Sequence, residues 1–183
     1  SGMCIRGRPG WGCSSRNGGQ VSGEVKPSYK ALARLHGPAQ AYAISAEARS
    51  ALRWVGDFIN DEGIDCDYRH CGRFHAAHSA QQYITQKQEF KSQVKGLERD
   101  GHLVDNTQIR SEVDSPFYHG GLVINQHASL DPARYHQGLY ERALASGCHA
   151  VDNCRVQNIV RNTDGFNLST AKGQIRAGKV IVE

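Results

Sequence analysis

The residues best suited to chemistry lie in one glycine-rich stretch near the start of the chain, Gly10 to Gln20. It reads Gly-Trp-Gly-Cys-Ser-Ser-Arg-Asn-Gly-Gly-Gln, with four glycines around polar residues. Glycine allows backbone angles that other residues avoid and lets a ligand approach the main chain closely, so amides here can face an anion such as phosphate. A surface Ω-loop without a ligand explains the same composition. Both interpretations remain open at this point.

Known short motifs do not decide between them. Gly10-x-Gly12-x-x-Ser15 is a weak relative of the dinucleotide fingerprint, which needs a preceding strand, a helix opening at the motif and an acid about 20 residues later. None of these features is present. Ser14 and Ser15 lack the Gly-x-Ser-x-Gly frame of serine hydrolases, and the nine histidines are scattered. The sequence therefore nominates no catalytic residue.

Cysteine and histidine also gather between residues 66 and 78, at Cys66, Cys71, His75 and His78. Zinc sites favour paired spacings such as CxxC with HxxxH, which this stretch lacks. The surrounding sequence is typical of a strand, in which positions 75 and 78 point to opposite faces. We therefore expect ordinary strand residues and no metal site.

Bulk composition is that of an ordinary soluble protein. The 183 residues carry 22 Lys and Arg against 18 Asp and Glu, for a net charge of +4 without a cationic block. Nucleic-acid partners are therefore not expected. No apolar run reaches the roughly 18 residues of a membrane span, and the start lacks a signal-peptide pattern. The six scattered cysteines favour reduced thiols and a cytoplasmic location.

Periodic patterns predict helices and strands that position these residues. Apolar residues at three- and four-residue steps predict a helix over about 39–61, after a polar connector, and a strand starting at Ile64. Ser79 is a candidate N-cap for a second helix over 79–100, which Gly101 would end. A glycine-broken aromatic segment follows over 115–124, and a short turn of helix is expected within 106–113.

The last third predicts one helix followed by strands. Asp131-Pro132 is a strong helix start, and Gly147 would terminate that helix after about Ser146. Strands are then expected over 149–152, 155–161, 166–170, 174–176 and 179–182, with tight turns at 162–165 and 171–173. The predicted fold class is α/β.

Two segments closely resemble the D-amino-acid-oxidase-type FAD-dependent oxidoreductases. The stretch 10–21 is similar to the family's flavin-contacting loop, and Ser115 to Leu122 with Leu130 to Tyr135 form a second match in the right order. The look-alikes include the gamma-glutamylputrescine-oxidising members. The resemblance implies an FAD cofactor and a small-molecule amine or amino-acid substrate that is oxidised by hydride transfer to flavin.

The resemblance also implies roles for individual residues. Those expected at the flavin and pyrophosphate are Ser15, Arg16, Asn17, Gly18, Gly19 and Gln20. The backbone of Val156 is expected at the adenine. The candidates for lining the substrate cavity are His75, Tyr118 and His119.

The chain departs from the family pattern at its start. Residues 1–9 are too few for a nucleotide-binding βαβ unit, and Ile5 falls near the position of a ribose-binding Glu. We therefore expect an incomplete Rossmann-like FAD-binding domain over 1–38 and 130–183, with an inserted substrate-domain region of antiparallel strands and helices over 39–129. The isolated chain is expected to be inactive. The alternative is a non-catalytic, truncated or degenerate paralogue that acts only as a folded binding module.

Overall fold

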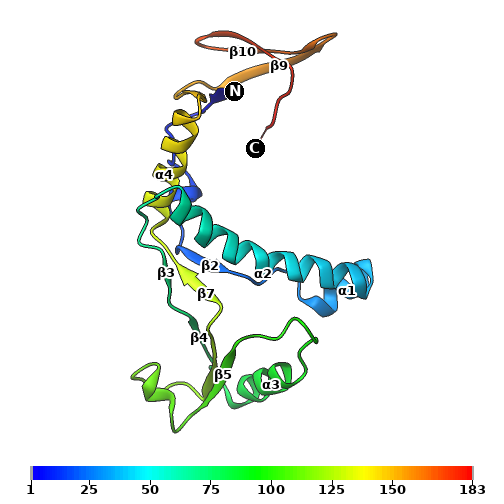
Figure 1. The fold of residues 1–183 in the computed structure, drawn as a ribbon, viewed down its shortest axis with the longest axis vertical. Helices are drawn as coiled ribbons and strands as arrows, with labels where there is room; N and C mark the ends of the chain where they lie inside the picture. The colour runs from blue at the N-terminus through cyan, green and yellow to red at the C-terminus, as the bar shows by residue number, and fades with distance from the viewer. Residues whose placement is uncertain (1, 183) are drawn as a thin grey trace. The chain divides into compact units, whose positions relative to one another are not determined.

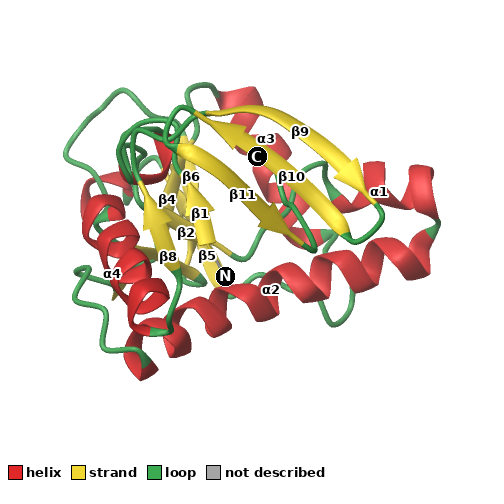
Figure 2. Ribbon diagram, turned by 90° about the horizontal axis from the view of Figure 1, so that it is seen from above, coloured by secondary structure: helices red, strands yellow, loops and turns green. Residues whose placement is uncertain are grey.

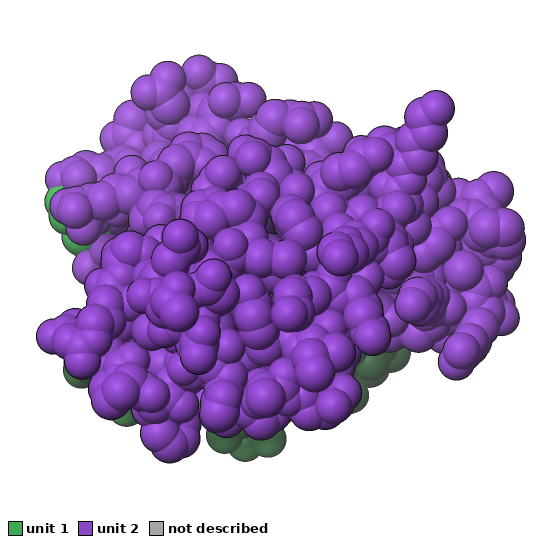
Figure 3. Space-filling view, turned by 90° about the horizontal axis from the view of Figure 1, so that it is seen from below, with its two compact units in different colours: residues 1–18, 132–183 green, residues 19–131 purple. Residues whose placement is uncertain are grey.

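The computed structural model describes residues 2–182 and forms two compact units, coloured separately in Figure 3. Ser1–Gly18 and Pro132–Glu183 make one unit, which we call the flanking unit. Gly19–Asp131 make the other, the inserted unit, because its sequence interrupts that of the first. The predicted domains were defined by where cofactor and substrate bind. The two compact units do not test that, so the domain division stays a prediction.

The flanking unit combines a parallel strand pair, a helix and an antiparallel sheet. β1 (Gly2–Cys4) pairs with β8 (His149–Val151), with Gly2 opposite His149. α4 (Pro132–Ala145) starts at a proline, which needs no hydrogen-bond partner there, and Gly147 follows it with the left-handed φ of +80° that ends many helices. The predicted helix is confirmed.

After β8, three strands form an antiparallel meander in the order β11-β10-β9 (Figure 2). They are β9 (Val156–Asn162), β10 (Gly165–Thr170) and β11 (Gly173–Ala177). Both predicted turns are confirmed. The strand predicted over 179–182 is wrong, because that stretch forms no ladder with any described residue. Its apolar composition favours a strand, but a strand also needs a partner.

The inserted unit holds two antiparallel sheets of three strands each. One has the order β2-β7-β3, made of β2 (Gln20–Ser22), β7 (His127–Ser129) and β3 (Arg69–His70). The other has the order β4-β6-β5, made of β4 (Arg73–Ala76), β6 (Gly120–Ile124) and β5 (Gly101–Asp105). A short 3-10 helix, η2 (Ile109–Ser111), lies within the predicted turn of helix. The strand predicted from Ile64 begins only at Arg69.

Three α-helices complete the inserted unit. The predicted helix over 39–61 is confirmed as α2 (Pro38–Asp61), the long helix in Figure 1, which buries Ala41, Leu52 and Ile59. α1 (Tyr29–His36) was not predicted, since the sequence reads there as a polar connector. Only Leu32 of α1 is buried, and the helix has just eight residues, which is too short for a helical period to stand out.

α3 (Ala80–Lys91) confirms the predicted start of the second helix and corrects its end. The Ser79 hydroxyl accepts a hydrogen bond from the Gln82 amide at 3.1 Å, so Ser79 is the N-cap. The chain leaves the helix at Ser92, nine residues before Gly101, and turns again at Gly96 with φ +81°. Gly101 therefore begins β5 rather than ending a helix.

Within residues 2–182, no helix combines the length and apolar character needed to cross a bilayer.

Candidate functional site

The Gly10–Gly18 part of the glycine-rich loop is closed by its own hydrogen bonds. At its centre lies a 3-10 helix, η1 (Cys13–Ser15), and the Arg16 amide donates to the Cys13 carbonyl at 3.1 Å. The Ser15 hydroxyl donates to the Gly10 carbonyl, and the Asn17 side-chain amide donates to the Cys13 carbonyl at 3.0 Å. The loop is therefore held in shape by residues of the segment itself.

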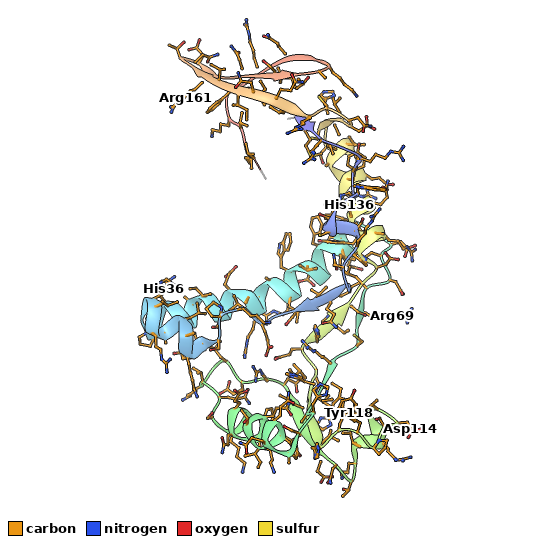
Figure 4. All side chains as sticks on the ribbon, turned by 180° about the vertical axis from the view of Figure 1, so that it is seen from behind. His36, Arg69, Asp114, Tyr118, His136 and Arg161 are labelled. Atoms are coloured by element: carbon orange, nitrogen blue, oxygen red, sulfur yellow. The ribbon has the colours of Figure 1, made fainter. Side chains whose placement is uncertain are left out.

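α4 anchors this loop at Gly10. Gly10 has φ +69°, and a Cβ atom there would lie 2.8 Å from the Nδ1 atom of His136 on α4 (Figure 4). Any side chain at position 10 would therefore collide with the imidazole ring. Gly10 is needed both for its backbone angle and for this close approach.

The exposed side of the loop carries an aromatic ring and a cation. The Arg16 guanidinium lies 4.3 Å from the centre of the Trp11 ring, a cation–π contact, and Trp11 is 65% exposed. Gly12 and Gly18 have open space where a Cβ would project. Another molecule can thus reach the main chain at these two positions.

The six residues predicted at the flavin are divided between the units. Ser15 to Gly18 belong to the flanking unit, whereas Gly19 and Gln20 belong to the inserted unit. Gly19 is buried and its carbonyl accepts from the Leu130 amide at 2.9 Å, and Gln20 pairs with Ser129 at the start of β2. Val156, predicted at the adenine, begins β9 in the flanking unit.

The substrate-cavity candidates all lie on or beside the β4-β6-β5 sheet of the inserted unit. His75 on β4 pairs with Leu122 on β6. The backbone of His119 extends this ladder, since its amide donates to the Ala77 carbonyl at 2.9 Å. Tyr118, labelled in Figure 4, precedes it and is partly buried. The three candidates therefore lie on β4 or just before β6, which are neighbouring strands of this sheet.

Strand register assigns His75 to one face of the sheet. Cross-strand partners share a face, as do alternate residues of a strand, so His75 lies on the side of Leu122 and Gly120. A Cβ at Gly120 would lie 2.8 Å from the Tyr83 ring on α3, so this is the face that α3 covers. Burial, and next the charge of Arg73, lower the pKa of His75 below its usual range.

α3 also contributes a buried amide beside His75. Gln86 is 6% exposed, and its side-chain nitrogen donates to the His75 carbonyl at 3.0 Å. Its side-chain oxygen is buried without a hydrogen-bond partner. The hydrogen bond fixes α3 against β4 next to a candidate residue.

Tyr118 belongs to an aromatic cluster that the sequence analysis missed. Its ring centre lies 5.3 Å from that of His78 and 5.4 Å from that of Phe117, both with edge-on geometry. Phe117 is 65% exposed. His78 was considered only as a metal ligand. Phe117 and Tyr118 follow it by 39 and 40 positions in the sequence, and no local pattern links residues so far apart. Among residues 2–182, no group of three or more His, Cys, Asp or Glu side chains is placed to hold a metal.

His127 on β7 was missed as well. It is 4% exposed, and its Nδ1 atom lies 2.7 Å from the Val21 carbonyl oxygen. A carbonyl only accepts, so Nδ1 carries the proton. Burial, followed by the charge of Arg73, lowers the pKa of His127. Through the Nδ1–H bond to Val21, this histidine links β7 to β2.

Comparison with known proteins places this architecture in a family. The family model described as DAO, FAD dependent oxidoreductase, matches residues 4–182. The chain belongs to this family of FAD-dependent oxidoreductases. The resemblance found in the loop and in the 115–135 region is thereby confirmed.

Two curated relatives extend the match. Gamma-glutamylputrescine oxidoreductase of Escherichia coli K12 is 28% identical over 179 residues, and the probable oxidoreductase OrdL of Haemophilus influenzae is 22% identical over 175 residues. Each alignment covers 96% of this chain and 41% of the relative. The chain therefore spans well under half the length of the relatives it matches.

Solved structures share the fold. Glycine oxidase from Geobacillus kaustophilus superposes with a TM-score of 0.77 at 15% identity, covering 97% of this chain and 46% of that protein. L-α-glycerophosphate oxidase from Mycoplasma pneumoniae, solved with FAD bound, gives a TM-score of 0.71 at 14% identity, with coverages of 93% and 43%. The mixed α/β fold is that of part of these oxidases.

The residues of the loop suit one part of FAD and not another. The Arg16 guanidinium and the exposed Ser14 hydroxyl are hydrogen-bond donors of the kind that suits a diphosphate, and nothing lies within 4 Å of a Cβ at Gly12 or Gly18. Ile5 follows β1, and its amide donates to the Val151 carbonyl at 2.9 Å. Its side chain has no acceptor for ribose hydroxyls.

Proposed function

We propose that this chain is part of an oxidoreductase that oxidises an amine or amino acid, with a gamma-glutamylputrescine-like substrate. The family membership over residues 4–182 carries this proposal, supported by the 28% identity to the gamma-glutamylputrescine oxidoreductase of Escherichia coli. The substrate would lose a hydride equivalent from carbon and a proton from nitrogen. When bound, FAD supplies the redox chemistry as the hydride acceptor, and O₂ or another acceptor reoxidises it.

In this proposal the protein binds and positions rather than donates or removes protons. Arg16 and the backbone of Ser15 to Gln20 would hold the flavin and pyrophosphate region, and the Val156 backbone would meet the adenine. His75, Tyr118 and His119 would line the substrate cavity. Residues 1–38 and 130–183 would then form an incomplete Rossmann-like FAD-binding domain, and residues 39–129 would belong to the substrate side.

Two measurements test the proposal. Titrating FAD into the 183-residue chain by calorimetry asks whether this part binds the cofactor. In the full-length parent, flavin absorbance should bleach when gamma-glutamylputrescine is added without oxygen. A parent protein that stays colourless in the presence of added FAD would contradict the proposal.

The same FAD titration distinguishes the proposed oxidoreductase from the alternative, which is a non-catalytic binding module. The absence of a ribose acceptor at Ile5 favours that alternative for the isolated chain. Micromolar FAD binding with turnover would reject it, whereas the absence of FAD binding would support it. The cytoplasmic location stays a prediction.

A further inference from the structure

Three arginines of the inserted unit line one small cavity. Its volume is about 280 Å³, and its walls include α2, the chain that follows β2 and the segment that leads into β5. The arginines are Arg49 and Arg53 of α2 and Arg99 before β5. Among the described residues that line the cavity, Glu24 is the one acidic side chain. Three cations against one carboxylate give the lining a formal charge of +2.

Helical periodicity and main-chain contacts explain how α2 presents its part of the lining. The α2 residues that line the cavity share one helix face, at positions i, i+3, i+4 and i+7: Ala46, Arg49, Ser50 and Arg53. The Arg49 guanidinium donates to the Leu97 carbonyl, and to that of Glu98 at 2.9 Å. Both acceptors are main-chain carbonyls, which hold the guanidinium in place without neutralising its charge.

Arg49 and Arg99 are close enough to repel each other. Burial, and next the charge of Arg99, lower the pKa of Arg49 below its usual value, and Glu24 and Glu98 oppose this effect. Glu24 also forms an ion pair with Arg99, whose Nε atom lies 2.5 Å from a carboxylate oxygen. One carboxylate in the described lining thus serves three guanidiniums, and an anionic ligand would supply the negative charge that is missing.

Two neutral side chains add hydrogen-bond donors to the small cavity. The Gln126 side-chain oxygen accepts from the Asp100 amide at 3.2 Å, which leaves the two N–H donors of the same side chain for another acceptor. The Ser50 hydroxyl accepts from Arg53 at 3.4 Å and keeps its own proton to donate. These donors suit an oxyanion.

A second, larger cavity of about 1000 Å³ shares the charged wall. The residues that line both cavities are Gly23, Glu24, Arg49, Leu97 and Arg99. The larger cavity adds apolar side chains from α1, from the chain before it and from the chain after α3: Val25, Pro27, Tyr29 and Val94. It also adds Lys26 and Lys30 against Glu89, so its cations again outnumber its acids.

We propose that the two cavities form one binding site for a small molecule with an oxyanion head and an apolar body. The head is a carboxylate or a phosphate and lies in the smaller cavity, because guanidinium donors match the oxygens of both groups. The body lies in the larger cavity, since ligand sites combine an apolar pocket of this size with a few polar groups. His75, Tyr118 and His119 line neither cavity, so this inference does not rest on the proposed function.

Calorimetry on the 183-residue chain tests the site with probes that separate head from body. Octanoate and octyl phosphate carry both parts, acetate carries only a head, and octanol carries only a body. We expect at least one octyl anion to bind about tenfold or more tightly than acetate and octanol, because burial of the chain and contacts to the anion both contribute. The octyl anion that binds more tightly identifies the head group.

Substitutions of charged lining residues test where the head binds. For the tighter-binding octyl anion, Arg99→Gln should weaken binding by about tenfold, the effect of one charge-assisted hydrogen bond. Arg53→Gln should weaken it by about two- to fivefold, because this side chain is exposed. Glu24→Gln should strengthen it, because a negative charge leaves the lining. Arg34→Gln is the matched control, since it removes the same charge from an exposed position on α1 that lines neither cavity.

Losses in Arg99→Gln and Arg53→Gln without a loss in Arg34→Gln would support the site. It would be overturned if neither octyl anion binds, if octanol binds as tightly as the anions, if Arg34→Gln causes an equal loss, or if Glu24→Gln weakens binding. Circular dichroism checks that each variant is folded, and Arg53→Gln decides alone if Arg99→Gln does not fold. No titration contains FAD, so failure of this site leaves the proposed function standing.

Discussion

His127 should make the stability of the chain depend on pH. Its pKa is lowered in the folded chain, first by burial and then by Arg73, whereas in the unfolded chain it titrates near the usual value of about 6.5. Below that pH the unfolded chain takes up a proton that the folded chain excludes. The free energy of unfolding should therefore fall as the pH is lowered from 7.5 through 6.5 towards the folded-state pKa.

Urea denaturation of the His127→Gln variant at several pH values checks this prediction. The variant should be about 1 kcal/mol less stable at pH 7.5 if the bond to Val21 is lost, and its pH dependence should be shallower. His102→Gln, at an exposed position on β5, is the control. An unchanged pH slope in the His127 variant would contradict the prediction.

Adding a single methyl group at Gly121 should destabilise the inserted unit. A Cβ atom there would overlap the Phe74 ring and lie 2.9 Å from the His75 carbonyl oxygen. We expect Gly121→Ala to lower the free energy of unfolding by about 1–3 kcal/mol, with partial recovery when Phe74 is also shortened to Leu. Gly178→Ala, where nothing lies within 4 Å, is the matched control in chemical denaturation. Equal losses in both variants would argue against this packing.

At the level of elements, the Ser79 cap should contribute measurably to α3. Ser79→Ala removes the acceptor of the Gln82 amide and should cost about 1 kcal/mol, whereas Ser79→Asp should retain most of the stability. Ser92→Ala, at the other end of the helix, is the control because its side chain does not cap an amide at the N-terminus. Thermal unfolding measures the stability of the three variants. If Ser79→Asp loses as much stability as Ser79→Ala, the capping role is contradicted.

The two ends of α3 show which boundaries a sequence can predict. Its start was predictable because the cap and its partner are three residues apart. Its end was not, because contacts with α2 shape the following segment: the Arg49 guanidinium binds the Leu97 carbonyl, and that of Glu98 at 2.9 Å. Leu97 is buried outside the helix, although its spacing also fits a helical stripe. Tertiary contacts of this kind leave no local signal.

For the chain as a whole, the family could be predicted because the motif of residues 10–21 is continuous in sequence. The two compact units, in contrast, are defined by which distant segments pack together, and a continuous motif does not encode that packing. The support of Gly10 by His136 and the ring contact of His78 with Tyr118 likewise join residues far apart. Patterns with short periods cannot reveal them.

Exposed apolar residues near residue 180 should promote self-association of the isolated chain. Ile181 and Val182 are 90% and 75% exposed, which is unusual for aliphatic side chains. Sedimentation velocity across a wide concentration range should detect association, and Ile181→Asp should reduce it. Gly178→Asp adds the same charge nearby without removing an apolar side chain. If both variants associate less to the same extent, charge repulsion rather than apolar contact is the cause.

The insertion of one unit into the sequence of the other sets an order for folding during synthesis. The inserted unit is continuous, so all its strands exist once Asp131 has left the ribosome. β1, in contrast, is made 147 residues before its partner among the described strands, β8, so Gly2 waits for His149. At 5–20 residues per second this delay is roughly 7–30 s. During it, β1 lacks the strand with which it pairs in the folded chain, and its backbone hydrogen-bonding groups stay open to other contacts.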